Sequence, residues 1–441
     1  MPLVEDLVAK HARYVLTPWA EQGGLRPPVI VRAFGSYLED AAGKRYLDLS
    51  SGLVAVNLGH GDARVVAAIA AQAQRLCFSP PGWFNDARVE LAEALVGLAP
   101  WQEGGRVFFT AGGAEANEDA IKIARTVTGR SKILSAYRSF HGSTFGSGTL
   151  SGENRRWPIE PGIGDVVHFF APFPYRSPFH TTDDAEETRR ALAHLEDIVA
   201  YEDAERIAAI LIEPVVGSNG VVVYPAGYLA GVRALCDRHG ILLIADEVMT
   251  GFGRTGAAFA TERYGVVPDI IVFAKGVTSA YVPCGGAIVR ESLAGYFDEH
   301  VLALGHTYSG HPLAMAAGVA ALSAYRQDGL FARAAALEAP LRARLEGLRE
   351  RHVSVGDVRG VGAFFALEFV SDRATRTPLV PWQGKSLGAM TTLFAGLRAR
   401  GVYAMGRYNV LHVAPPLTVS DDELDEALHA LDGAIDDLEA A

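Results

Sequence analysis

Two charged residues, Asp246 and Lys275, each follow an apolar run that is typical of a buried strand. Residues 241–245 precede the aspartate, and residues 270–274 precede the lysine. Ligands of open parallel sheets bind at the C-terminal edge of the strands, where both side chains are expected. There an amine can form a Schiff base with an aldehyde, and a carboxylate can hold a proton on a pyridine nitrogen. The pair therefore predicts a catalytic site for pyridoxal 5'-phosphate (PLP).

Each of the two residues also has a simpler interpretation. A lone lysine after a strand is most often a surface cap, and a lone aspartate can cap a helix or join a salt bridge. For the PLP hypothesis to be wrong, both simpler interpretations would have to hold at the same sheet edge, which requires two coincidences. Val248 strengthens the PLP hypothesis because the two-residue period of a strand directs its methyls to the same face as Asp246. Glu247 should then point away, and burial of Lys275 should lower the pKa of its amine.

A second feature fits the phosphate of such a cofactor. Gly112, Gly113 and Ala114 open a helix expected to begin near Glu115, so their backbone N–H groups lie at the positive end of a helix dipole. A Gly-Gly turn alone equally fits a loop that needs positive φ. The stretch 140–142 follows another strand, and there Phe140 could stack on the cofactor ring while His141 supports the site. Core packing and strand capping are the alternatives for these two residues.

The elements that must position these residues alternate along the chain. Between residues 105 and 290, short apolar strands alternate with helical stretches, which predicts βαβ units and a mostly parallel sheet. From residue 313 the pattern changes to long amphipathic helices and a few short strands. The first 60 residues predict a β-hairpin that packs with this C-terminal layer. The expected C-terminal elements are helices at 313–327 and 330–350 and strands at 363–369 and 409–413; the hairpin strands are 35–40 and 43–48.

Composition limits the class of protein. The 441 residues are 49% apolar and carry a formal net charge of −11, which gives no electrostatic footprint for nucleic acid or an anionic membrane. Three widely spaced cysteines fit neither a disulfide framework nor a metal site, and no metal is expected. No apolar run could cross a bilayer, and the N-terminus lacks a signal-peptide core. A cytoplasmic globular enzyme is expected.

Together these segments resemble the class III (omega-) aminotransferases of PLP fold type I. The likeness runs from about Trp19 to the final helix, and the order and spacing of its motifs agree with that family. The motifs are FFTAGGAEANE at 108–118, FHGST at 140–144, IEPVVG at 212–217, ADEVMTGFGRTG at 245–256, FAKG at 273–276 and HTYSGHP at 306–312.

The resemblance implies a fold and a set of roles. In that family the lysine matching Lys275 bonds to the cofactor, the aspartate matching Asp246 pairs with the pyridinium, and the threonine matching Thr307 binds phosphate across a dimer interface. Glu213 of the Glu-Pro motif joins the cofactor-binding set. The implied fold is α/β, with a mostly parallel seven-stranded sheet in a large domain (61–315) and a smaller α+β domain from both chain ends (1–60 and 316–441). A homodimer with shared active sites is implied as well.

Three positions depart from the usual family pattern. Ala114 stands where a serine or threonine is frequent, so one hydroxyl contact to phosphate is absent. Val216 replaces a frequent glutamine, and Phe140 replaces a frequent tyrosine. The essential acid and lysine are both retained.

The activity implied is a ping-pong transfer of an amino group from an amine or omega-amino acid to an oxo acid such as pyruvate. The donor expected is taurine-like, β-alanine-like or an arylalkyl amine. Many relatives bind carboxylate with an arginine where this chain has Met405, and Arg407 lies two residues later on the same strand face. Trp19 and Trp83 could line an apolar pocket. A surface role for Arg407, and core or interface packing for the two tryptophans, are equally open.

Two other functions remain open from the sequence. A PLP-dependent aminomutase or decarboxylase of the same fold would need no oxo-acid acceptor. A non-catalytic PLP-binding scaffold is the more distant alternative, and loss of the lysine is its usual sign.

Overall fold

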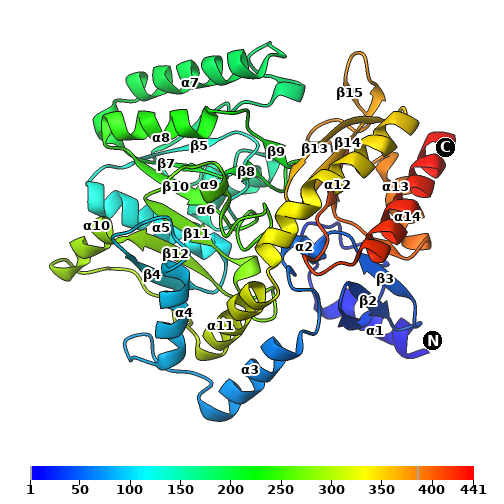
Figure 1. Ribbon diagram of the computed structural model, residues 1–441, viewed down its shortest axis with the longest axis horizontal. Coiled ribbons are helices and arrows are strands. Elements are labelled where there is room, and N and C mark those ends of the chain that lie inside the picture. The colour runs from blue at the N-terminus through cyan, green and yellow to red at the C-terminus, as the bar shows by residue number, and fades with distance from the viewer. Residues whose placement is uncertain (1, 385–386) are drawn as a thin grey trace.

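The computed structural model describes residues 2–384 and 387–441, and its elements fall into two groups (Figure 1). The segments coloured cyan to green form the group on the left of the view. The blue N-terminal and the orange to red C-terminal segments lie together on the right. The two ends of the chain therefore share one group, as the sequence predicts.

The first group is built on a seven-stranded sheet in the order β4, β12, β11, β10, β7, β5, β6. Only β12 runs antiparallel to its neighbours in this sheet, and β10 pairs in parallel with both β7 and β11. This confirms the predicted, mostly parallel sheet. The strands are β4 (Gly105–Thr110), β5 (Lys132–Ala136), β6 (Val166–Phe169), β7 (Ile207–Ile212), β10 (Leu242–Asp246), β11 (Ile270–Phe273) and β12 (Gly285–Arg290).

Helices cover both faces of this sheet. Its helices are α3 (Ala63–Arg75), α4 (Asp86–Val96), α5 (Gly113–Thr128), α6 (Phe145–Leu150), α7 (Asp184–Tyr201), α8 (Tyr228–His239), α9 (Ala260–Arg263), α10 (Glu291–Ala294) and α11 (Pro312–Gln327). On β11, Ile270 and Val272 pack with α5, whereas Ile271 and Phe273 pack with α4 and α11 on the opposite face. Helices α7 and α8 cover β5 and β7. Burial on both faces accounts for the continuous apolar runs in the sequence.

The second group contains two smaller sheets. In one, β16 pairs in parallel with β3 of the N-terminal hairpin, which joins the two chain ends. The other has β14 at its centre and includes the strand that carries Arg407. The elements are α1 (Pro2–Tyr14), β1 (Ile30–Phe34), β2 (Tyr37–Asp40), β3 (Arg45–Asp48), α2 (Ser51–Val54), α12 (Leu330–Arg351), β13 (Val355–Val361), β14 (Phe364–Asp372), β15 (Thr377–Pro378), α13 (Met390–Ala399), β16 (Val402–Tyr403), β17 (Gly406–Arg407), β18 (Val410–Val413) and α14 (Asp421–Ala440).

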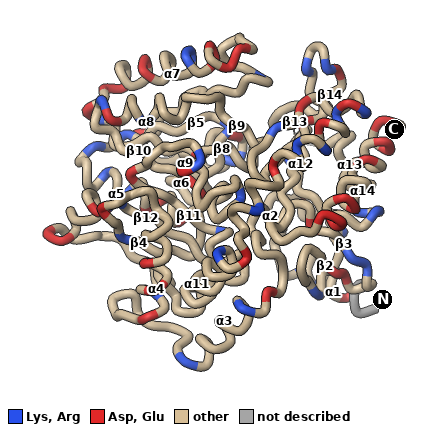
Figure 2. The backbone as a smooth tube through the Cα atoms, in the orientation of Figure 1, with Lys and Arg blue, Asp and Glu red and all other residues tan. Residues whose placement is uncertain are grey.

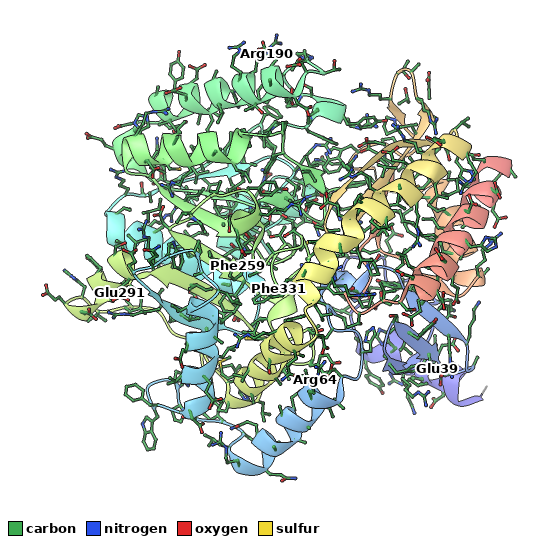
Figure 3. The ribbon with its side chains drawn as sticks, in the orientation of Figure 1. Glu39, Arg64, Arg190, Phe259, Glu291 and Phe331 are labelled. Atoms are coloured by element: carbon green, nitrogen blue, oxygen red, sulfur yellow. The ribbon has the colours of Figure 1, made fainter. Side chains whose placement is uncertain are left out.

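Helix α12 spans both groups. Its first half packs in the core that contains α4 and α11, and its second half packs in the core of the second group. Phe331 at the start of α12 and Phe259 lie near the middle of the molecule (Figure 3). Helix α11 lies beyond residue 315 for most of its length, yet it packs on α3 and α4. The domain limits 61–315, 1–60 and 316–441 stay a prediction.

Local differences from the sequence prediction are small. The hairpin, the two long helices and the strands near 363–369 and 409–413 are present. Strand β13 was not predicted, because its glycines and charged residues give no clear two-residue alternation. A short hairpin, β8 (Val215–Val216) with β9 (Val222–Val223), was also not predicted. Helix α5 begins at Gly113, two residues before Glu115.

Charges of both signs are interspersed over the outer helices (Figure 2). Helix α14 is an exception, because it carries nine acidic residues and no lysine or arginine. Among the described residues, no helix is long and apolar enough to cross a membrane.

Candidate active site

Asp246 lies at the C-terminal tip of β10 and is buried. Its Oδ2 accepts a hydrogen bond from Asn117 Nδ2 on α5 (2.9 Å) and lies 2.7 Å from His141 Nδ1. Its Oδ1 accepts from the backbone N–H of Val248 (3.1 Å). These contacts fix the plane of the carboxylate. His141 thus contacts Asp246 directly, and its supporting role in the site stays a prediction.

Lys275 follows β11 at the same edge of the sheet. It has a φ of 47°, a conformation that non-glycine residues rarely adopt and that concentrates at functional sites. Its amine makes no hydrogen bond or ion pair with the rest of the described chain, and it borders a cavity. Burial lowers the pKa of this amine to about 8, against the opposing effect of the Asp246 and Glu213 carboxylates. A neutral, nucleophilic amine is thus accessible near neutral pH.

The start of α5 forms another wall of this cavity, through Gly112, Gly113 and Ala114. A Cβ at Gly113 would lie 3.0 and 3.1 Å from the two methyl carbons of Val248, so the helix approaches Val248 as closely as a glycine allows. The free N–H groups at the start of a helix suit an anion such as phosphate.

Phe140 and Glu213 border the cavity beside Lys275. Glu213 accepts hydrogen bonds from the backbone N–H groups of Phe140 (2.9 Å) and Gly217 (2.7 Å), so it fixes the loop that carries the aromatic ring. Burial, strengthened by the nearby Asp246 charge, raises the pKa of Glu213 to about 7. Glu247 points to the other side, where Thr261 and the backbone N–H of Ala260 bind its carboxylate.

The cavity has a volume of about 990 Å³, enough for a cofactor together with a small substrate. The sequence of residues 20–435 matches the model of the aminotransferase class-III family. The chain belongs to this family. Class III aminotransferases use PLP. The residues around the cavity fit this cofactor: Lys275 offers an amine without a partner, Asp246 offers an oriented carboxylate, and the start of α5 offers backbone N–H groups for phosphate.

Similar proteins agree with this assignment. A probable aminotransferase of Mycobacterium tuberculosis is 38% identical over 91% of this chain and 88% of its own length. The structure of a taurine:2-oxoglutarate aminotransferase from Bifidobacterium kashiwanohense, in complex with PLP and glutamate, has a TM-score of 0.95 at 44% identity and covers 98% of this chain and 97% of its own. An (S)-enantioselective omega-transaminase from Thermomicrobium roseum has a TM-score of 0.93 at 39% identity, with 98% of each chain covered.

The remaining predicted residues of this class III aminotransferase divide into two sets. Trp19 and Arg407 border the cavity. Trp83 and Thr307 are exposed and lie outside the cavity lining of this chain. Thr307 follows His306, whose Nε2 lies 2.6 Å from Asp119 Oδ2 on α5. That contact ties the Thr307 segment to the helix whose start borders the cavity.

Sequence reasoning missed three residues that matter to the site. Asn117 lies one turn after Gly113 on α5, within a motif that was recognised, so its spacing could have indicated that it faces Asp246. Arg155 borders the cavity, with its guanidinium carbon 3.5 Å from the centre of the Phe140 ring. Glu153 contacts both Arg155 and Arg407. Neither residue stands in a periodic element, so no pattern in the sequence marks them.

Proposed function

We propose that this class III aminotransferase moves an amino group from a taurine-like or β-alanine-like donor, or from an arylalkyl amine, to an oxo acid such as pyruvate by a ping-pong mechanism. The observation that carries this proposal is that Arg407 and the unpartnered amine of Lys275 border the same cavity. A guanidinium there can bind a sulfonate or carboxylate while the amine acts at the other end of the substrate. The similarity to a taurine:2-oxoglutarate aminotransferase supports the taurine-like donor, and the similarity to an amine transaminase supports an amine donor.

Bound PLP supplies an aldehyde for covalent attachment and a cationic ring that accepts the electron pair of the substrate C–H bond. Lys275 Nζ would hold the aldehyde of the cofactor until a donor amine takes its place. The freed Lys275 would then be a neutral base close to the amine-bearing carbon of the substrate, from which it would remove a proton. The lowered pKa of Lys275, about 8, suits this role. The acceptor oxo acid reverses the same steps.

Asp246 would hold a proton on the ring nitrogen, because its negative charge and fixed plane would stabilise a cationic ring. We place the phosphate at the N–H groups of Gly112, Gly113 and Ala114. Phe140 and Val248 would contact the ring. His141 orients Asp246, and Glu213 positions Phe140 through the bond to its backbone N–H. Each of these roles is a proposal for this chain.

A second copy of the chain would complete the site. Thr307 is exposed here, and we propose that it contacts the phosphate in the partner subunit of a homodimer. Trp83 is 73% exposed and Phe84 is 97% exposed, which favours burial of this segment against the second copy. Under this proposal Trp83 reaches the partner's pocket, while Trp19 borders the pocket of its own chain. Residence in the cytoplasm stays a prediction.

Product analysis tests the proposed reaction. The holoenzyme is incubated with taurine or β-alanine and pyruvate, and alanine formation is measured. Alanine that depends on both substrates is expected. Consumption of the donor without pyruvate would instead indicate a mutase or decarboxylase. Arg407→Ala should raise the KM for pyruvate about tenfold or more and leave the KM for the neutral 1-phenylethylamine nearly unchanged. An equal effect on both would reject Arg407 as the anion-binding residue.

A further inference from the structure

Glu153 is a fully buried carboxylate between two arginines. Its Oε1 accepts a hydrogen bond from Arg155 Nε, and its Oε2 accepts one from Arg407 Nη2. Glu153 and Arg407 lie 254 positions apart in the sequence. Glu153 immediately precedes the short 3-10 helix Asn154–Ile159. A carboxylate without access to water is stable here only because both of its oxygens are paired.

The two arginines border the cavity, whereas Glu153 lies behind them. Arg155 also donates from Nη2 to Ser218 Oγ (2.9 Å), and Arg407 donates from Nη2 to Asn154 Oδ1 (2.8 Å). The Nη1 groups of both arginines make no hydrogen bond with any described residue. Protein contacts therefore fix each guanidinium, and its Nη1 group remains able to donate hydrogen bonds to a ligand.

The charges of this cluster do not cancel. Two guanidinium groups and one carboxylate leave one net positive charge in the wall of the cavity, in a chain whose formal net charge is −11. Burial lowers the pKa of Arg155, and the Arg407 charge lowers it further, so the two cations act on each other. An anionic ligand would relieve that repulsion.

We propose that Glu153 is a positioning residue that holds Arg155 and Arg407 as one binding site for a single anionic group, sulfonate or carboxylate, and that its charge limits how tightly this site binds. The inference rests on the proposed function. In a ping-pong reaction one anion must leave this site before the next can enter. Two guanidiniums without a counterion would bind the first product too tightly for rapid exchange. With Glu153 present, the site still attracts anions, but its affinity is low enough for them to dissociate.

The test is equilibrium binding of an anion that cannot react. Ethanesulfonate lacks an amine, so its affinity for the holoenzyme reports the site without turnover. Glu153→Gln keeps the size of the side chain and removes its charge. It should tighten ethanesulfonate binding about tenfold and leave the binding of neutral 1-phenylethanol unchanged. In turnover the KM for pyruvate should fall together with kcat, because the first product leaves more slowly. Unchanged or weaker ethanesulfonate binding would overturn the proposal.

Glu160→Gln is the matched control. Glu160 lies in the same segment and pairs with Arg156 (3.0 Å), an arginine that is not among the cavity-lining residues. This variant removes an equal charge and should leave ethanesulfonate binding unchanged. An equal tightening in both variants would mean that only the overall charge matters, which would also overturn the proposal.

A second variant keeps the proposal testable if Glu153→Gln does not fold. Arg155→Gln leaves Arg407 paired with Glu153, and the cluster then has no net charge. Ethanesulfonate affinity should fall at least tenfold while 1-phenylethanol affinity is unchanged. Retained ethanesulfonate affinity would contradict a joint site. If all binding results hold but no anionic donor is transaminated, the proposed function fails and the anion site stands.

Discussion

Asn117 on α5 and Asp246 at the tip of β10 are joined by a hydrogen bond of 2.9 Å across 129 residues of sequence. The same helix starts at Gly113, which borders the cavity at the proposed phosphate position. One helix therefore borders the proposed phosphate position and also orients the carboxylate proposed to pair with the ring nitrogen. This arrangement fixes the distance between the two ends of the proposed cofactor site.

Removal of Asn117 should loosen this arrangement. Asn117→Ala leaves Asp246 with His141 as its one side-chain partner, beside the backbone N–H of Val248. The value of kcat should fall about tenfold to hundredfold, as when a residue that orients a catalytic group is lost. Titration of the apoenzyme with PLP should also show weaker binding. Lys122→Ala, at an exposed position on the same helix, is the control and should change neither quantity. Unchanged kcat in Asn117→Ala would contradict the orienting role.

The reactivity of Lys275 should depend on pH in a shifted range. Because burial lowers the pKa of this amine to about 8, its neutral form prevails above that pH, and an ordinary lysine becomes neutral only near 10.5. The rate at which the apoenzyme forms a covalent bond with PLP should therefore rise with pH to a midpoint near 8 and then level off. Stopped-flow absorbance measures this rate. A rate that still rises steeply at pH 10 would show an amine with an ordinary pKa.

Gly113 lies so close to Val248 that a methyl group at position 113 should not be tolerated. In Gly113→Ala the new Cβ would press on both Val248 methyls at about 3.0 Å and push them toward the proposed ring position. PLP affinity should fall tenfold or more while the fold persists. Gly164→Ala is the control, because nothing lies within 4 Å of its added Cβ. Fluorescence titration with PLP distinguishes the two variants.

Arg254 should be important for stability rather than for chemistry. It is fully buried and donates to the carbonyls of Ala363 (3.0 Å) and Pro415 (2.7 Å) and to Asn57 Oδ1 (2.9 Å), so it ties together segments from both chain ends. Arg254→Met leaves these acceptors unsatisfied and should destabilise the protein by about 3 kcal/mol. Thermal unfolding should show a lower Tm.

An exposed arginine is the control for that experiment. Arg189→Met removes a guanidinium whose pair with Glu186 lies on the surface of α7, and the Tm should change little. An equal loss of Tm in both variants would show that burial of Arg254 is not the cause.

The chemistry at the strand tips could be predicted from the sequence because it is local. Asp246 and Lys275 each follow an apolar run, and the two-residue period alone places Val248 on the same face as Asp246. The role of Glu153 could not be predicted, because its contact with Arg407 depends on how the second group of elements sits on the first. The roles proposed for Thr307 and Trp83 require a second copy of the chain, which no local pattern describes. For β13, charged residues and glycines obscured the alternation that marks a strand.

The most direct measurement of the central claim is the visible spectrum of the PLP-loaded protein during a half-reaction. Taurine, β-alanine, 4-aminobutyrate, ornithine and 1-phenylethylamine are added one at a time. The account predicts that the band of lysine-bound PLP converts to the pyridoxamine form with an anionic omega-amino donor and returns when pyruvate is added. A band that forms with PLP but does not respond to any of these amines would contradict the proposed aminotransferase function.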